Sequence, residues 1–418
     1  MGYIAIAFEH SIRINKAATA LITGVLCWTV YILFAGDKDA VTGKLAHSFG
    51  GLSQILFFLM CSMAIVELID AHDGFEVITR RIKTTSKRKI LWIISLLSFF
   101  LSAVLNNLTT AIVMISLLRK LVGNRNDRLM IAGLIVIAAN AGGVWSPIGD
   151  VTTTMLWIGN QVTPFNVIIK LIVPSLVCLL APLLILQYSF RGEVQKPDQA
   201  FEQPGETRST KKERMIVFFT GVILLLMVPV FTAVTGLPPV MGILIGLGLM
   251  WMITETIHSG KDEEDRKKFT VAYALRKIDT ATILFFLGIL LAVSALEATQ
   301  QLQDVAGWMD KNLKDQNIIA GSIGLLSSVV DNVPLVAATQ GMYSLDSFPT
   351  DHYFWEFIAY CTGTGGSILI IGSAAGVAAM GLEKINFIWY LKKIGWLALA
   401  GYIAGAVVYI LQNRLFGI

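Results

Sequence analysis

Long apolar runs separated by short charged stretches are the main feature of the sequence. A helix needs about 20 apolar residues to cross a hydrocarbon core about 30 Å thick. Runs of roughly that length or longer occupy residues 16–35, 52–70, 166–190, 214–236, 238–257, 279–300 and 386–412. The pattern therefore predicts an all-α polytopic membrane protein.

Four further apolar segments are interrupted by polar residues near their middle. Residues 90–122 and 317–345 each consist of two short apolar arms joined by a polar run. The first arm would reach roughly 24 Å as a helix, which is short of the bilayer core, so we expect two re-entrant helical hairpins. Residues 129–160 and 353–382 are longer, and glycine and polar residues interrupt them, which predicts two broken transmembrane helices.

The basic residues predict how these segments are oriented. Residues 79–89 and 119–128 are both strongly basic, and basic loops favour the cytoplasm. The two loops share that side only if residues 90–122 enter the membrane and turn back. The same count places residues 191–214 and 258–277 in the cytoplasm. The second hairpin then enters from the opposite side, where we expect loops poor in basic residues at 36–51, 301–316 and 346–352.

The two halves of the chain carry the same short motifs in the same order. The pairs are Ile55–Leu59 with Ile283–Leu287, Leu101–Asn107 with Leu326–Asn332, and Ala141–Gly143 with Thr364–Gly366. Because the two hairpins would enter from opposite sides, the repeats are inverted, as in many secondary transporters. We predict a first inverted repeat over 1–190, a cytoplasmic linker over 191–213 and a second inverted repeat over 214–418.

Composition excludes several other classes of protein. Of the 418 residues, 55% are hydrophobic and 15% are charged, whereas a soluble domain has about 25% charged residues. A net charge of +4 is too small for a nucleic-acid-binding protein. The four cysteines lie in apolar runs without metal or redox spacing. The apolar stretch at residues 2–8 is too short to span a bilayer and has no basic region before it, so no cleavable signal is predicted.

Polar residues at the hairpin tips and helix breaks are the candidate site. Backbone without helical partners survives in a membrane only where protein buries it or where it lines a wet cavity, and small cations use its carbonyls together with side-chain oxygens. We expect Na⁺ or Li⁺ to bind there, with no transition metal and no cofactor. The candidate ligands are Asn106, Asn107, Thr109, Thr110, Asn140, Ser146, Asp150, Thr153, Ser327, Asp331, Asn332, Thr364, Ser367 and Ser373.

Asp150 and Asp331 are the most informative of these residues. A carboxylate near the bilayer centre is costly unless it is protonated, paired or bound to a cation. A proton and a metal ion then compete for one group, which is the minimal chemistry of an antiporter. The alternative for each aspartate is an ion pair with a buried Lys or Arg, but neither the broken segments nor the parts of the hairpin arms nearest the tips contain one.

Other acidic residues and the histidines give weaker signals. Glu67 and Asp70 lie one helical turn apart near the cytoplasmic end of their helix. They are either a proton pathway or solvated end residues. Glu255, Asp279 and Glu297 are expected at the membrane interfaces, and the histidines are scattered, which disfavours a metal site.

At these motifs the chain resembles the NhaD-type sodium/proton antiporters of the ion transporter superfamily. The resemblance covers roughly residues 3–412, and residues 101–110, 140–150, 330–338 and 360–376 carry it. It implies exchange of Na⁺ or Li⁺ for H⁺, a role in pH homeostasis and salt tolerance, a homodimer in a bacterial inner membrane, and an elevator-like motion of the hairpins. One departure is Asn106-Asn107 at the first tip, where an Asp-Asn pair is common in the family.

Two other functions remain as alternatives. One is a sodium-coupled dicarboxylate or other anion symporter of the same superfamily. Such symporters carry a Ser-Asn-Thr pattern at both hairpin tips, and this chain lacks that pattern. The other is an intramembrane aspartyl protease. Such proteases carry a Gly-x-Gly-Asp motif together with a second motif, Tyr-Asp. Here residue 147 is proline and no Tyr-Asp pair occurs, so this alternative is remote.

Overall fold

The computed structural model describes residues 15–79, 82, 84–194, 209–262 and 266–416. This part of the chain is almost entirely helical and contains no strand, which confirms the predicted fold class. The apolar stretch at residues 2–8 and most of the linker predicted over 191–213 lie outside the described residues.

Nine helical segments of the described chain are long and apolar enough to cross a membrane, so the protein is a multi-pass membrane protein. They are α3 (Lys16–Phe34), α4 (Lys38–Ala71), α6 (Lys87–Leu105), α8 (Arg125–Val144), α10 (Pro164–Gln187), α11 (Lys211–Thr235), α12 (Pro239–Ile257), α15 (Thr280–Ala298) and the segment Phe387–Leu415. That last segment comprises α21 (Phe387–Tyr390), a π-helical turn (Leu391–Gly395) and α22 (Trp396–Phe416). The short helices α5 (Glu76–Thr79) and α14 (Val271–Lys277) lie beside α4.

Both expected hairpins are present as pairs of helices. The first consists of α6 and α7 (Asn107–Leu121), and the start of α6 lies beside the start of α8, because Lys87 Nζ lies 2.6 Å from Asp127 Oδ2. The second consists of α17 (Gln316–Leu326) and α18 (Asn332–Met342). Arg88 near the open end of the first hairpin donates to the Gln187 carbonyl at one end of α10. The loop after the second hairpin meets the other end of α10, where Asp351 accepts from the Thr163 amide.

Both predicted broken helices are present as well. The first is α8 followed by α9 (Val151–Ile158), and the second is α19 (Tyr353–Gly365) followed by α20 (Ala374–Glu383). In each, a short non-helical segment separates the two parts. Pro147 lies in the first interruption, where it has no amide proton to donate the hydrogen bond that would continue α8.

Two loops predicted on the side opposite the basic loops are helical instead, so those predictions were wrong. Residues 36–51 belong mostly to α4, which runs unbroken for 34 residues from its cap at Asp37. Gly50 and Gly51 do not interrupt it, because a glycine costs a helix only about 1 kcal/mol. Residues 301–316 contain α16 (Gln301–Leu313), which buries Leu302, Ala306 and Met309 on one face. The apolar spacing of four and three residues explains this amphipathic helix.

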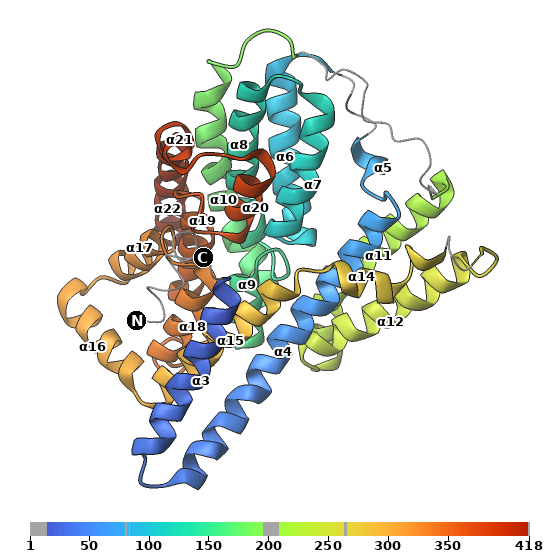
Figure 1. The fold of residues 1–418 in the computed structure, drawn as a ribbon. Coiled ribbons are helices and arrows are strands. Elements are labelled where there is room, and N and C mark those ends of the chain that lie inside the picture. Colours follow the sequence, from blue (N-terminus) through green and yellow to red (C-terminus); the bar gives the residue numbers. More distant parts are fainter. Residues whose placement is uncertain (1–14, 80–81, 83, 195–208, 263–265, 417–418) are drawn as a thin grey trace.

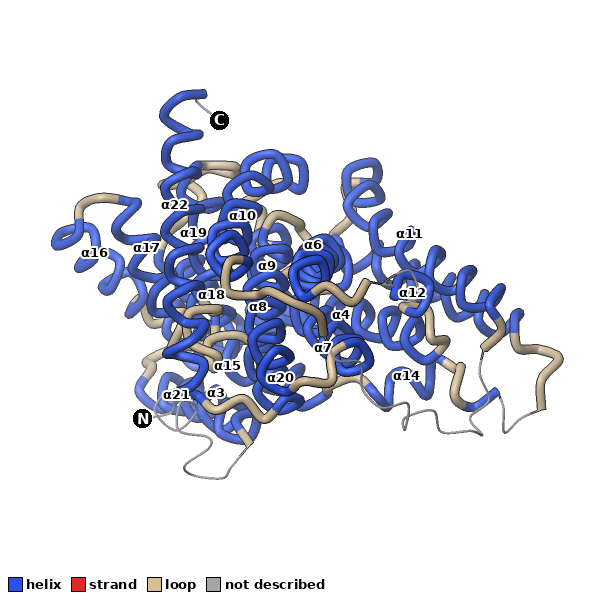
Figure 2. Tube along the Cα trace, turned by 90° about the horizontal axis from the view of Figure 1, so that it is seen from above, coloured by secondary structure: helices blue, strands red, loops and turns tan. Residues whose placement is uncertain are grey.

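The helices form a central group and an outer pair. Figure 1 shows α6, α7, α8 and α10 standing beside α19, α20 and α22, while α4 slopes away toward α11 and α12. In the view from above, α11 and α12 lie at the edge of the molecule, away from α8 and α9 (Figure 2). Of the candidate spans, α8 is the most deeply buried. The broken helices are therefore surrounded by protein.

The two halves use the same hydrogen bond at their hairpins. Ser102 Oγ on α6 donates to the Ala139 carbonyl of α8 at 2.5 Å. Ser327 Oγ at the end of α17 donates to the Thr362 carbonyl of α19 at 2.7 Å. These residues occupy matching positions of the two predicted repeats, so the pairing supports the repeat division, which stays a prediction.

Matching glycines lie where each hairpin touches its broken helix. A Cβ at Gly142 of α8 would collide with the Phe99 carbonyl of α6, and a Cβ at Gly365 of α19 would collide with the Gly324 carbonyl of α17. Only glycine allows these backbones to approach so closely, a common device between membrane helices. The glycines thus bring each hairpin tip to a helix break.

Candidate cation-binding site

Asp150 lies at the first helix break, where it caps α9. Its side chain is 1% exposed, and no ion pair joins it to a basic side chain of the described residues. Oδ1 accepts from the backbone amide and the hydroxyl of Thr152, both at 3.0 Å. Oδ2 accepts from the side-chain amide of Asn107 at 3.1 Å. A buried carboxylate with only neutral donors is a site for either a proton or a cation.

Asn107 connects the first hairpin tip to this carboxylate. Its Nδ2 donates to Asn140 Oδ1 and to Asp150 Oδ2, both at 3.1 Å, while its Oδ1 accepts from the Leu108 amide at 2.8 Å. Rotating the side-chain amide by half a turn would present the oxygen to the site instead, since the two arrangements differ only in hydrogen bonding. Asn107 can thus serve Asp150 as a donor or a bound cation as a ligand.

Asn140 joins the two broken helices. Its Nδ2 donates to Ser367 Oγ and Ser373 Oγ, both at 2.8 Å, and these two serines flank the break between α19 and α20. All three side chains are buried. Five predicted residues, Asn107, Asn140, Asp150, Ser367 and Ser373, therefore form one polar network at the centre of the protein.

The backbone at the first tip is strained. Asn106 is the single residue between α6 and α7, and its φ of 68° with ψ of 161° falls in a region that is normally restricted to glycine. Its side chain caps α7 by accepting from the Thr109 amide at 2.9 Å. The hydroxyl of Thr110, four residues after Asn106, is buried and has no hydrogen-bond partner among the described residues. Thr110 therefore stays a predicted ligand.

Four predicted hydroxyl ligands donate hydrogen bonds to backbone carbonyls. The bonds are Ser146 to Ala103, Thr153 to Val144, Ser327 to Thr362 and Thr364 to Tyr360, at 2.5, 3.3, 2.7 and 2.6 Å. These bonds satisfy carbonyls at the tips and breaks. Each hydroxyl oxygen keeps its lone pairs, so the four residues stay predicted ligands.

Asp331 at the second tip forms an ion pair, although we expected no basic partner for either aspartate. Its Oδ1 caps α18 by accepting from the Val333 amide at 3.3 Å, and its Oδ2 lies 3.7 Å from Lys16 Nζ. Asn332, the next residue, is 4% exposed. Sequence reasoning missed Lys16 because it precedes an apolar run, where a lysine ordinarily lies at the membrane surface. Asp331 and Asp150 are near enough for their negative charges to repel each other.

A cavity of about 380 Å³ lies between α4, α7, α15 and α20. Glu67 and Asp70 line it, together with Lys16, Thr109 of the first tip and Lys277. The two acidic residues therefore face a space that reaches the first hairpin tip. Both interpretations of Glu67 and Asp70, as a proton pathway or as solvated residues at a helix end, stay open. Their location beside the cavity supports the proton pathway.

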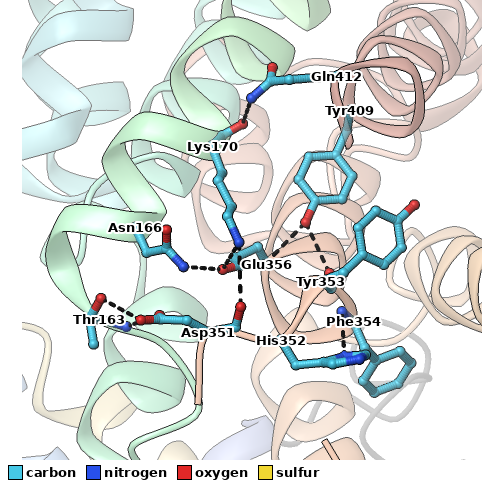
Figure 3. Close-up of polar contacts among 10 residues, drawn as sticks. All are labelled: Thr163, Asn166, Lys170, Asp351, His352, Tyr353, Phe354, Glu356, Tyr409 and Gln412. Atoms are coloured by element: carbon cyan, nitrogen blue, oxygen red, sulfur yellow. Dashed lines mark hydrogen bonds and ion pairs between the residues drawn. The ribbon is translucent and has the colours of Figure 1, made fainter. Parts of the chain in front are cut away.

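A second buried ion pair lies outside the predicted site (Figure 3). Glu356 on α19 is fully buried, and its Oε1 lies 3.1 Å from Lys170 Nζ and 2.9 Å from Asn166 Nδ2, both on α10. Its Oε2 accepts from the Tyr409 hydroxyl of α22 at 3.2 Å. Every oxygen has a partner, so the cluster joins three helices. An acidic residue inside a predicted broken helix was the signal that could have identified it.

A third buried carboxylate lies at the other end of the same broken helix, where α20 ends. Glu383 at the end of α20 accepts from Arg119 Nε at 2.7 Å and from Arg128 Nε at 2.8 Å. These arginines end the first hairpin and begin α8. Two of the basic residues that predicted a cytoplasmic loop thus also hold α20 in place.

Membrane-crossing helices that enclose a polar network between hairpin tips and helix breaks define the chain as a polytopic membrane transporter. It belongs to the citrate transporter family, which matches residues 3–355. Similar proteins include Sodium/proton antiporter 1 of Arabidopsis thaliana, 47% identical over 99% of this chain and 71% of the relative. Sodium/proton antiporter 2 of the same plant is 44% identical over 98% of this chain and 97% of the relative.

The resemblance to the NhaD-type antiporters is confirmed. The Na⁺/H⁺ antiporter NhaD of Vibrio cholerae is 29% identical over 99% of this chain and 90% of the relative. These relatives are named as transporters, so the prediction that the chain is not an enzyme is confirmed and the protease alternative is set aside. Because two relatives are plant proteins, the bacterial inner membrane stays a prediction.

Proposed function

We propose that the protein exchanges Na⁺ or Li⁺ for H⁺ across its membrane. The observation that carries the proposal is Asp150, a buried carboxylate held by Thr152 and the hairpin-tip Asn107 without a basic partner. A proton and a cation exclude each other at such a group. The names of the relatives, sodium/proton antiporters from plants and bacteria, agree with this chemistry.

The exchange cycle follows from that competition. A cation enters the polar network, takes oxygens of Asp150, Asn140 and the tips as ligands, and displaces the proton. Glu67 and Asp70, which line the cavity beside the first tip, pass the proton between the site and solvent. The hairpins and broken helices then move together against α3, α4 and α15, as in an elevator-like carrier, and we expect two copies to form a homodimer that steadies this motion.

Anion symport is the second candidate, because the family description names citrate. An anion would have to approach Asp150 and Asp331, whereas Lys16 is the one basic side chain of the described residues paired at these tips. Like charges in a buried site repel strongly. The charge of the site therefore favours a cation as cargo.

The test is ion-driven proton movement in proteoliposomes that contain an internal pH dye. Inward gradients of Na⁺ and Li⁺ should each raise the internal pH, whereas K⁺, citrate and succinate should not. Asp150→Asn should abolish the signal, because it keeps the shape of the side chain but removes the titratable oxygen. Glu297→Gln, a matched change on α15, should leave it intact. If the protein transports citrate and a Na⁺ gradient drives no proton export, the antiporter proposal is wrong and anion symport replaces it.

A further inference from the structure

Lys16 reaches the second hairpin tip from a different part of the protein. It is the first residue of α3, and its Nζ lies 3.7 Å from Asp331 Oδ2 and 4.5 Å from the centre of the Phe285 ring on α15. The lysine side chain is 24% exposed and the aspartate 15%. The pair is therefore partly withdrawn from water, where opposite charges attract more strongly than at a surface.

The pair lies where the α3–α15 pair packs against the second hairpin, because α15 also contacts α18. α3 packs tightly on α15, where a Cβ at Gly24 would crowd the Gly288 carbonyl. Asp331 caps α18 in the second hairpin, and that hairpin packs on the broken helix α19. The Lys16–Asp331 contact thus connects the α3–α15 pair to the hairpin tip that carries a candidate cation ligand.

Lys16 also lines the cavity beside the site. The same space is lined by Glu67, Asp70 and Thr109, while Asp331 is not part of its lining. Lys16 therefore lies beside both the cavity and the Asp331 carboxylate. A cation in this cavity is close to the ammonium group that pairs with Asp331.

We propose that the Lys16 ammonium is the counterion of Asp331 in the cation-free carrier, and that a transported cation binds Asp331 by displacing it. This inference rests on the proposed cation exchange and adds a positioning residue to it. An ammonium group and a metal cation that approach the same partly buried carboxylate repel each other, so each weakens the binding of the other. Lys16 keeps its proton when displaced, so no bond forms or breaks. It acts as a tethered competitor that lowers the apparent affinity for the cation.

Replacing Lys16 with glutamine removes the competitor. If the ion pair is formed 80–90% of the time, the apparent affinity for Na⁺ should tighten by roughly 5- to 10-fold. Lys16→Arg keeps the positive charge and should stay within about twofold of the wild type. Lys44→Gln is the control, because it removes a positive charge that contacts the Tyr31 hydroxyl and the Ala298 carbonyl and not Asp331, so its affinity should also change by less than about twofold.

Apparent Na⁺ affinity is measured in two ways, as the KM of proton movement in proteoliposomes and as Na⁺-dependent thermal stabilisation in detergent. A purely structural role for Lys16 predicts a lower maximal rate or melting temperature with unchanged affinity. Unchanged or weaker affinity in Lys16→Gln overturns the inference. Loss of Na⁺-driven proton movement in the wild type would instead overturn the proposed function, while stabilisation by Na⁺ could still report on Lys16.

A measurement on the wild-type protein covers the case in which Lys16→Gln does not fold. Amine labelling followed by mass spectrometry reports how freely the Lys16 ammonium reacts. Saturating NaCl should raise labelling of Lys16 several-fold relative to choline chloride of equal ionic strength, and labelling of Lys277 should not change. Equal labelling of Lys16 in both salts shows that the cation does not displace it and overturns the inference.

Discussion

At the scale of single residues, the site is built from neutral donors around one buried charge. Asp150 accepts from Asn107 and from Thr152, and Asn140 extends the network to the second broken helix. Thr152 was absent from the predicted ligands, although its position two residues after an N-cap aspartate is typical of a capping contact. Removing one partner of such a network leaves a buried polar group unpaired.

Asn107→Ala tests whether the first tip binds the cation. The substitution removes an amide that reaches Asp150, so the apparent Na⁺ affinity should fall about 5- to 150-fold, equivalent to about 1–3 kcal/mol. Titrating Na⁺ against proton movement in proteoliposomes gives the affinity. Asn312→Ala is the matched control, since Asn312 is exposed on α16 and donates only within its own helix. Wild-type affinity in Asn107→Ala would make the tip a packing contact.

A histidine pair at the ends of α4 and α12 predicts a pH dependence of stability. His72 and His258 are buried, and their Nε2 atoms lie 2.8 Å apart. His72 Nδ1 lies 2.6 Å from the Leu68 carbonyl, so it carries the proton, and His258 must donate through Nε2. Both imidazoles are then neutral. The charged groups facing the pair are Asp73, Glu213, Lys261 and Arg266.

Burial, and then the positive charge of Lys261, lowers the pKa of His258 to about 4, and burial also lowers the pKa of His72. Below pH 6.5 the unfolded chain binds protons that the folded protein does not, so stability falls as the pH drops toward 4. The loss grows as the pH falls toward 4, because the unfolded chain protonates this imidazole before the folded protein does. Melting curves in detergent should show His258→Gln with a shallower decline than wild type, and His47→Gln with the wild-type decline.

At the scale of elements, close backbone contact decides where each hairpin meets its broken helix. Gly142 and Gly365 each lie against a carbonyl of a hairpin arm. The ion pairs of Glu356 and Glu383 then anchor the two ends of the second broken helix to neighbouring helices. Breaking a buried pair by removing one partner is costly, so these ion pairs help to fix the helix positions.

Gly365→Ala tests the contact between α19 and α17. The added Cβ would collide with the Gly324 carbonyl, and overpacking of this kind costs about 1–3 kcal/mol. We expect a lower melting temperature in detergent. Gly381→Ala on α20 is the control, because open space surrounds that position and alanine favours a helix by up to about 1 kcal/mol. Equal melting temperatures for the two variants would contradict close packing at Gly365.

At the scale of the whole molecule, the two hairpins open at opposite ends of α10. Arg88 contacts the end of α10 at Gln187, and Asp351 contacts its beginning at Thr163. This arrangement supports the inverted orientation of the repeats that the basic loops predict.

Cysteine labelling tests this orientation. In a background with the half-buried Cys27 replaced by alanine, cysteines at Lys89 and Arg125 should react with a membrane-impermeant reagent only from the cytoplasm. Both positions flank the first hairpin and are exposed. A cysteine at the exposed Ser347 should react only from the opposite side. Labelling of positions 89 and 125 from different sides would contradict the re-entrant hairpin.

The sequence by itself determined the membrane-spanning helices, the two hairpins and the two helix breaks, because apolar length and polar interruptions act locally along the chain. It also identified Asp150 and the asparagines around it, since a carboxylate inside an apolar segment is costly unless it is protonated, paired or bound to a cation. Tertiary structure alone decided which oxygens face one another. It turned Ser146 and Thr364 toward carbonyls and brought Lys16 to Asp331, because contacts between distant segments depend on packing that no local pattern records.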